Sequence, residues 1–115
     1  MIVSHNREVL GTPIDNDQIK NAVKKVLISP GQGWEGYVMR EFELGQGGYT
    51  PRHTHPWPHI NYILEGTGSL YLDGQDYALE AGSFAFVPSN ELHQFTNTGE
   101  GRFAFICIVP EEGDK

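Results

Sequence analysis

Short apolar runs separated by turn residues most limit what this chain can fold into. Its 115 residues include 14 glycines and seven prolines, spread along the length with no repeat period. A helical bundle would hardly tolerate so many glycines and prolines, whereas small proteins built from short strands use them at every turn. The length is about that of one domain with one hydrophobic core, which predicts a single domain over residues 1–115.

Eight strand-like runs follow one another from residue 26 onward. They are Val26–Ser29, Gly36–Leu44, His59–Leu64, Gly68–Leu72, Gln75–Leu79, Ser83–Pro88, His93–Asn97 and Phe103–Val109. This number and spacing predict a β-sandwich or β-barrel. Asp73-Gly74 suits the positive φ angles of a type I′ turn, so the runs on either side of it should pair antiparallel. Residues 1–25 are less readable, and either a short helix or an arm packed on another subunit fits them.

The net charge of −7 makes nucleic-acid backbones and anionic membranes poor partners for this chain. The sequence has no apolar run of about 18 residues and lacks the charged-then-apolar pattern of a signal peptide, so we expect a cytoplasmic protein. A single cysteine, Cys107, excludes an internal disulfide and a cysteine-based zinc knuckle. A bound metal would therefore depend mainly on imidazole ligands.

Three of the five histidines, His53, His55 and His59, fall within seven residues. Residues two apart on a strand point to the same face, so His53 and His55 can chelate one ion together. His59 follows the stiff segment Pro56-Trp57-Pro58 and is a third ligand candidate. His93 comes from a distant run, and taken alone it could equally be a surface or core histidine.

The spacing of these residues resembles the two motifs of the cupin superfamily. Residues 47–66 match the first motif through Gly47, His53, His55 and Gly66, and residues 82–97 match the second through Gly82, Pro88, His93 and Asn97. Two positions depart from the usual pattern. His59 stands where cupins usually have a glutamate, and Asn90 stands in place of a usual glycine.

The resemblance implies an all-β fold, the double-stranded β-helix or jelly-roll barrel, of the small single-domain conserved-barrel (cupin 2) type. It also implies one divalent transition metal per chain held by His53, His55, His59 and His93, as in a subgroup of cupins with four histidine ligands. Manganese, iron, nickel and zinc are the metals that the resemblance favours. Because four neutral imidazoles leave the ion its full charge, anionic ligands such as carboxylates or enolates should be attracted to it.

Six further residues are candidates for the pocket around the metal. Arg40 shares a strand face with apolar residues, so it either binds a substrate anion, pairs with a carboxylate or lies at the barrel mouth. Asn61 either contacts the site or faces solvent, and Cys107 is either an inert core thiol or a soft group near the metal. Trp57 could cover the site or make a subunit contact. Tyr49 and Phe105 complete the set.

The resemblance covers several functions, since cupins include dioxygenases, decarboxylases, isomerases, storage proteins and sensor domains. The leading hypothesis is a metal-dependent enzyme, an oxygenase or a lyase/isomerase, acting on a small anionic or enolic molecule. The alternative is a non-enzymatic module that binds a small molecule or uses the metal structurally. We expect a homodimer, because pairing of two small barrels buries exposed sheet edges, with the N-terminal arm of residues 1–25 a candidate for exchange between subunits.

Overall fold

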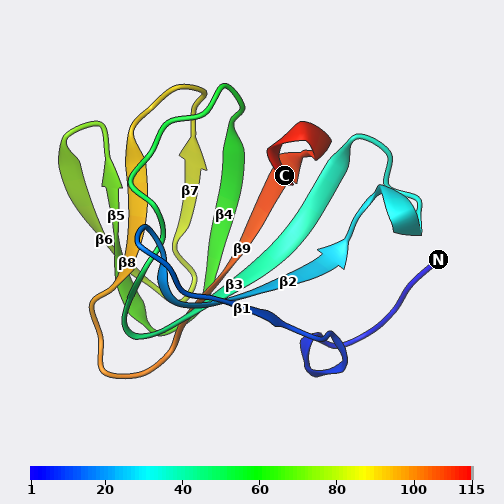
Figure 1. Ribbon diagram of the computed structural model, residues 1–115, viewed down its shortest axis with the longest axis horizontal. Coiled ribbons are helices and arrows are strands. Elements are labelled where there is room, and N and C mark those ends of the chain that lie inside the picture. The colour runs from blue at the N-terminus through cyan, green and yellow to red at the C-terminus, as the bar shows by residue number, and fades with distance from the viewer. Residues whose placement is uncertain (115) are drawn as a thin grey trace.

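The computed structural model describes residues 1–114 and is built almost entirely from strands (Figure 1). The strands are β1 (Thr12–Ile14), β2 (Lys20–Ile28), β3 (Tyr37–Tyr49), β4 (His59–Glu65), β5 (Thr67–Leu72), β6 (Gln75–Glu80), β7 (Phe84–Val87), β8 (His93–Asn97) and β9 (Phe103–Pro110). Three short 3-10 turns complete the described chain: η1 (Asn6–Glu8), η2 (Pro30–Gln32) and η3 (Glu111–Asp114).

All strand pairs are antiparallel, and their order along the sheet is β6-β5-β8-β3-β9-β4-β7, with β2 added to β3 and β1 added to β2. The sheet curls into a nearly closed barrel, with β6 and β7 at the two ends of the order (Figure 1). The predicted all-β jelly-roll barrel is confirmed. None of the helices in residues 1–114 is long and apolar enough to span a membrane.

The predicted hairpin around Asp73-Gly74 is also confirmed. Leu72 pairs with Gln75, and the two residues between them have φ angles of 47° and 87°. Positive φ at both central positions is the mark of a type I′ turn, whose twist matches that of the flanking strands.

The N-terminal part of the chain differs from the prediction. Residues 1–114 contain nine strands instead of eight, because residues 12–14 form β1, and β2 begins at Lys20 instead of Val26. Residues 1–25 form the three-residue 3-10 turn η1, β1 and the first part of β2, with no α-helix, so the short-helix alternative for this segment is wrong. Pairing with β3 places Ala22 opposite Leu44 and stabilises an extended conformation, although polar and apolar residues are mixed in this part of the sequence.

The residues before β1 pack on the same chain, over the outer face of β2 and β3. The Asn6 side chain donates a hydrogen bond of 2.6 Å to Glu41, and Lys25 donates one of 3.0 Å to Asn6. Glu41 is thereby buried, with 1% exposure, although it lies on the outward face of β3. Exchange of this segment between subunits stays a prediction.

Side chains along β3 point alternately into and out of the barrel. Val38 and Leu44 are buried on its inward face, with Arg40 and Phe42 between them on the same face. Phe105 packs against Phe95 and Phe103, with ring centroids 4.4 Å and 5.5 Å away. This apolar core fills part of the barrel and leaves a cavity beside it.

Candidate metal centre

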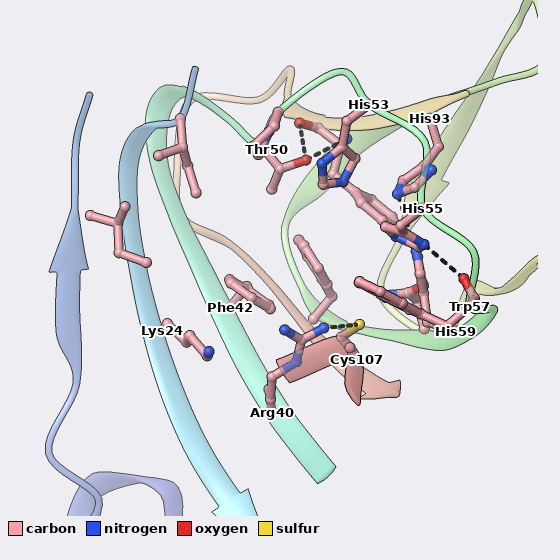
Figure 2. A pocket seen from close by; sticks show the side chains of 17 residues that line it. Lys24, Arg40, Phe42, Thr50, His53, His55, Trp57, His59, His93 and Cys107 are labelled. Carbon is pink, nitrogen blue, oxygen red and sulfur yellow. Dashed lines mark hydrogen bonds between the residues drawn. The ribbon is translucent and has the colours of Figure 1, made fainter. Parts of the chain in front are cut away.

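Four histidine rings from three segments meet at one side of this cavity, with neighbouring ring centroids 4.7–5.2 Å apart (Figure 2). We call His53, His55, His59 and His93 the histidine cluster. His53 and His55 lie in the loop before β4, His59 begins β4, and His93 begins β8. His53 and His93 exchange two backbone hydrogen bonds of 3.1 Å, and the His55 carbonyl accepts another from Asn90. These bonds hold the loop against β8.

Three members of the histidine cluster place one ring nitrogen each within 4.8 Å of the others, namely His53, His55 and His93. His59 is not in this group, although its Nε2 lies 3.2 Å from the Nε2 of His93. The four-histidine ligand set is therefore not confirmed, and the three-histidine group is what the geometry establishes.

Hydrogen bonds to the Nδ1 atoms determine which nitrogen of each imidazole ring is free to bind a metal. His59 Nδ1 lies 2.6 Å from Asn61 Oδ1, while Asn61 Nδ2 donates to the Ile106 carbonyl. The Nδ1 atoms of His55 and His93 lie 2.7 Å and 2.8 Å from backbone carbonyls. Because those oxygens only accept, each of these Nδ1 atoms carries the proton and each Nε2 has a free lone pair.

Lowered pKa values keep three imidazoles of the cluster, those of His53, His59 and His93, neutral. Burial, strengthened by neighbouring imidazoles, lowers the pKa of His59 to about 3, against the pull of its bond to Asn61. Partial burial and the adjacent imidazoles lower the pKa of His53 to about 4, and burial also lowers that of His93. At neutral pH these rings therefore offer lone pairs instead of positive charge.

These features fit a bound transition metal. Two nitrogens that each lie about 2.1 Å from one ion are no more than roughly 4.2 Å apart, and the Nε2 atoms of His59 and His93 satisfy this limit at 3.2 Å. Two lone pairs that face each other at this distance without a proton between them repel, and a cation removes that repulsion. All-nitrogen donors suit zinc, iron, manganese or nickel and disfavour calcium and magnesium.

Two asparagines of the second cupin motif have physical roles. Asn90, in place of a glycine, has a φ angle of 67°, a left-handed conformation that asparagine tolerates better than most residues. Asn97 is buried, and its Nδ2 lies 2.8–3.0 Å from the carbonyls of Leu44, Gly45 and Gly101. Asn97 thus ties β8 to β3, and its contacts are with backbone.

The histidine cluster opens on a cavity of about 250 Å³. Five of the six predicted pocket residues line it: Arg40, Trp57, Asn61, Phe105 and Cys107. Tyr49 is not among the lining residues of the described chain. It lies at the end of β3, opposite Thr96 and Lys20.

Strand register explains how three of these polar residues meet. Arg40 of β3 pairs with Cys107 of β9, which in turn pairs with Asn61 of β4. The three residues therefore form a row across the sheet. Arg40 Nη2 donates to Cys107 Sγ over 3.0 Å (Figure 2). Burial raises the pKa of the Cys107 thiol, which is therefore neutral at pH 7.

Trp57 makes the contact that closes one side of the cavity. Its ring stacks on His55 with centroids 4.9 Å apart and planes at 8°. A side chain on Gly113 of η3 would collide with the Trp57 ring, so the C-terminal turn packs directly on it. Trp57 thus contacts both the histidine cluster and η3.

Sequence reasoning missed Lys24 and Asp114. Lys24 lines the cavity from β2, and its Nζ lies 2.8 Å from Asp114 Oδ1. Once β2 is known to begin at Lys20, alternation from the buried Ala22 would have placed Lys24 inward. No sequence signal identifies Asp114, because η3 reaches the cavity through tertiary packing alone.

Comparison with known proteins agrees with this geometry. Residues 40–109 match the family model Cupin_2, described as a cupin domain. The chain is 30% identical over 96 residues to 1-methylthio-D-xylulose 5-phosphate methylsulfurylase of Rhodospirillum rubrum, covering 84% of this chain and 60% of that protein. The chain therefore spans less than two thirds of this curated relative.

Two solved structures are similar along most of the chain. The polyketide cyclase RemF from Streptomyces resistomycificus has a TM-score of 0.89 and 29% identity, covering 96% of this chain and 80% of that one. A predicted oxalate decarboxylase from Thermotoga maritima has a TM-score of 0.87 and 26% identity, covering 95% and 98%. The names of these similar proteins refer to different reactions on one fold.

Proposed function

This chain belongs to the cupin domain family, and from that premise we propose that it is a metal-dependent enzyme acting on a small anionic or enolic molecule. The observation that carries the proposal is the pair of Nε2 lone pairs of His59 and His93, which face each other 3.2 Å apart beside an open cavity. We propose that all four members of the histidine cluster hold one divalent ion, with manganese, iron, nickel or zinc as candidates.

Such an ion would act as a Lewis acid toward a carbonyl, carboxylate or enolate oxygen of the substrate. The protein contributes orientation and a partly dry environment. Asn61 holds the His59 ring, and Trp57 stacks on His55. Phe95 and Phe105 give the cavity an apolar wall that excludes water from the reacting end.

Anionic substrates are favoured by two considerations. Four neutral ligands leave the charge of a divalent ion uncompensated, which attracts an anion. The names of two similar proteins also refer to anionic small molecules, a xylulose 5-phosphate and oxalate. The reaction class, oxygenase or lyase/isomerase, belongs to the proposal and is left for activity screening to decide.

The alternative is a non-enzymatic module that binds a small molecule or uses the metal only structurally. A structural metal site is usually closed by its protein ligands. Here His53 is exposed and a cavity reaches the cluster, so a bound ion would be accessible to a substrate, which favours an enzyme over a structural role.

The metal site is tested by elemental analysis of protein purified without added metal. We expect about one equivalent in the wild type, and loss of most of it in His53→Ala, His59→Ala and His93→Ala. His5→Ala is the matched control, because His5 lies in the exposed N-terminal segment. Full metal content in His53→Ala and His93→Ala would show that the site is wrongly assigned.

The enzymatic part is tested on the metal-loaded protein. We expect turnover in a screen of carboxylates, diols and flavonol-like enols, followed by O₂ uptake and by product analysis for isomers. Turnover that persists in His93→Ala would separate the activity from the proposed centre. Stoichiometric metal with no turnover of any compound would favour the non-enzymatic alternative.

Two further expectations from the sequence, a homodimer and a cytoplasmic location, stay proposals. An exposed apolar face on β4 and β7 supports the first, with Phe84 78% exposed and Phe86 61% exposed.

A further inference from the structure

Two positively charged side chains face the cavity away from the histidine cluster. Lys24 and Arg40 line its wall, with side-chain exposures of 23% and 12%. Figure 2 shows them on one side of the cavity and the four histidines on the other, with Phe42 and Cys107 also labelled along the wall. A mostly buried guanidinium and a mostly buried ammonium are costly unless their charges are compensated.

The compensation within the described chain is incomplete. One carboxylate serves both cations, since Asp114 Oδ1 lies 2.8 Å from Lys24 Nζ and 3.5 Å from Arg40 Nη1. Arg40 Nη2 donates to Cys107, whose thiol is neutral. Two positive charges against one negative charge leave one unit of positive charge on this wall.

The second feature of this wall is a hydrogen-bond donor of Arg40. Its Nε is buried and has no hydrogen-bond partner in residues 1–114. A buried donor left unpaired costs about 1–3 kcal/mol, more when the group is charged. An oxyanion in the cavity would compensate the positive charge and bind the free donor, because it can accept several N–H bonds from a guanidinium at once.

The Asp114 carboxylate is placed so that such an anion can displace it. It lies in a turn of four residues, η3, and its 3.5 Å distance to Arg40 is longer than the usual 2.7–2.9 Å of a charge-assisted hydrogen bond. The contact of η3 with Trp57, through Gly113, does not involve the Asp114 carboxylate.

We propose that Lys24 and Arg40 form a subsite for the carboxylate or phosphate group of a small substrate, and that Asp114 occupies this subsite until the substrate displaces it. The proposal rests on the proposed function, because it assumes that the reacting end of the substrate lies at the histidine cluster. The substrate is then a bifunctional molecule, with an oxygen ligand at one end and an anionic group at the other. A cavity of about 250 Å³ restricts it to a small compound.

The test measures dissociation constants of inorganic phosphate and of malonate by calorimetry, on the full chain, both metal-loaded and after chelation. We expect Arg40→Gln and Lys24→Gln to weaken binding of these probes about tenfold or more, as expected for loss of a charged hydrogen bond. Asp114→Asn should strengthen binding several-fold, because it removes the competing carboxylate. Lys20→Gln is the matched control, an exposed lysine on the same strand β2, and should change nothing.

Metal content and thermal unfolding are measured on the same samples, so that failure of this subsite is distinguishable from failure of the metal centre. Probe affinity that is unchanged in both Arg40→Gln and Lys24→Gln overturns the subsite, even if the metal is present. Equal affinity of Asp114→Asn and the wild type overturns the displacement by substrate. Probe binding that depends on Arg40 and Lys24, in a protein that takes up no metal when metal is supplied, supports the subsite and counts against the metal-dependent function.

Discussion

Asn61 shows how one neutral side chain can control a metal ligand. It is completely buried, its amide is held by the Ile106 carbonyl, and its Oδ1 lies 2.6 Å from His59 Nδ1. A group in this position selects the tautomer of the imidazole and orients its ring, and loss of such groups typically lowers metal affinity 10–100-fold.

We therefore expect Asn61→Leu to weaken metal binding by about 10–100-fold, because His59 loses its acceptor. Competition with a chromophoric chelator measures this. Asn61→Asp keeps an acceptor for His59 Nδ1 and should bind metal at least as tightly as the wild type. Equal affinities of Asn61→Leu and the wild type would show that Asn61 does not orient the ligand.

Glu41 is a second residue whose state depends on its surroundings. Burial raises its pKa to about 7, and the neighbouring Glu43 adds to this effect, while the contacts with Asn6 and Lys25 oppose it. The carboxyl–carboxylate contact lowers the pKa of Glu43, with Arg102 and Lys25 acting in the same direction. Of the two carboxyl groups, Glu41 is therefore the one that keeps its proton to higher pH.

The sign of the pH effect follows from proton binding. Between the ordinary glutamate pKa of 4.5 and about 7, folded Glu41 binds more protons than unfolded Glu41, so its contribution to stability falls as pH rises through this window. We expect Glu41→Gln, which imitates the protonated acid, to gain stability relative to the wild type between pH 5 and pH 8. Thermal unfolding at both pH values measures it, with a shift of a few degrees expected for about 1 kcal/mol. A difference that is constant with pH would contradict the assignment.

At the scale of elements, the ends of strands decide the shape of the barrel. Gly66 joins β4 to β5 with a φ angle of 85°, and a Cβ there would collide with the Arg102 carbonyl. The turn needs both a left-handed backbone and a close approach of another chain segment, which glycine alone satisfies without strain.

Gly66→Ala should therefore lose about 1–2 kcal/mol or more, since an L-residue in the left-handed region is strained by roughly this amount even without the collision. Urea unfolding at constant m-value measures the loss. Gly101→Ala is the control, because a Cβ at Gly101 meets no atom within 4 Å. Similar losses in the two variants would show that the Gly66 backbone is not the cause.

At the scale of the whole molecule, one outer face is apolar. Ile60, Tyr62 and Leu64 of β4 and Phe84 and Phe86 of β7 are 41–78% exposed. These five side chains expose an apolar area on the order of 500 Å², more than half of the roughly 800 Å² that each partner contributes to a standard interface. The set carries no charge, so two copies of a chain with net charge −7 can meet there without direct repulsion.

We predict a homodimer through this face. Phe84→Glu and Phe86→Glu should convert it to a monomer, because a two-fold contact would place the new carboxylates close to one another. Sedimentation at several concentrations measures the mass. Tyr37→Glu, an exposed aromatic at the start of β3, should leave the dimer intact. A monomeric wild type would refute the prediction.

Local patterns in the sequence were sufficient for much of the fold. Short-range rules determine the Asp73-Gly74 turn and the alternation of β3 that directs Arg40 inward, because both depend on neighbours along the chain. The spacing of the histidines, read through the cupin motifs, likewise pointed to the residues that the barrel brings together.

Other features of the protein depend on contacts between distant segments and follow only from the tertiary structure. β2 forms because β3 offers a partner, against the weak local pattern of residues 20–25. Burial of Glu41 requires the N-terminal segment to fold back over β3, and the pairing of Lys24 and Arg40 with Asp114 requires η3 to reach the cavity. Sequence by itself indicated which side chains could bind a metal and which residues of β3 share one face. Packing determined which charges are left uncompensated beside them, because compensation is a property of neighbours in space.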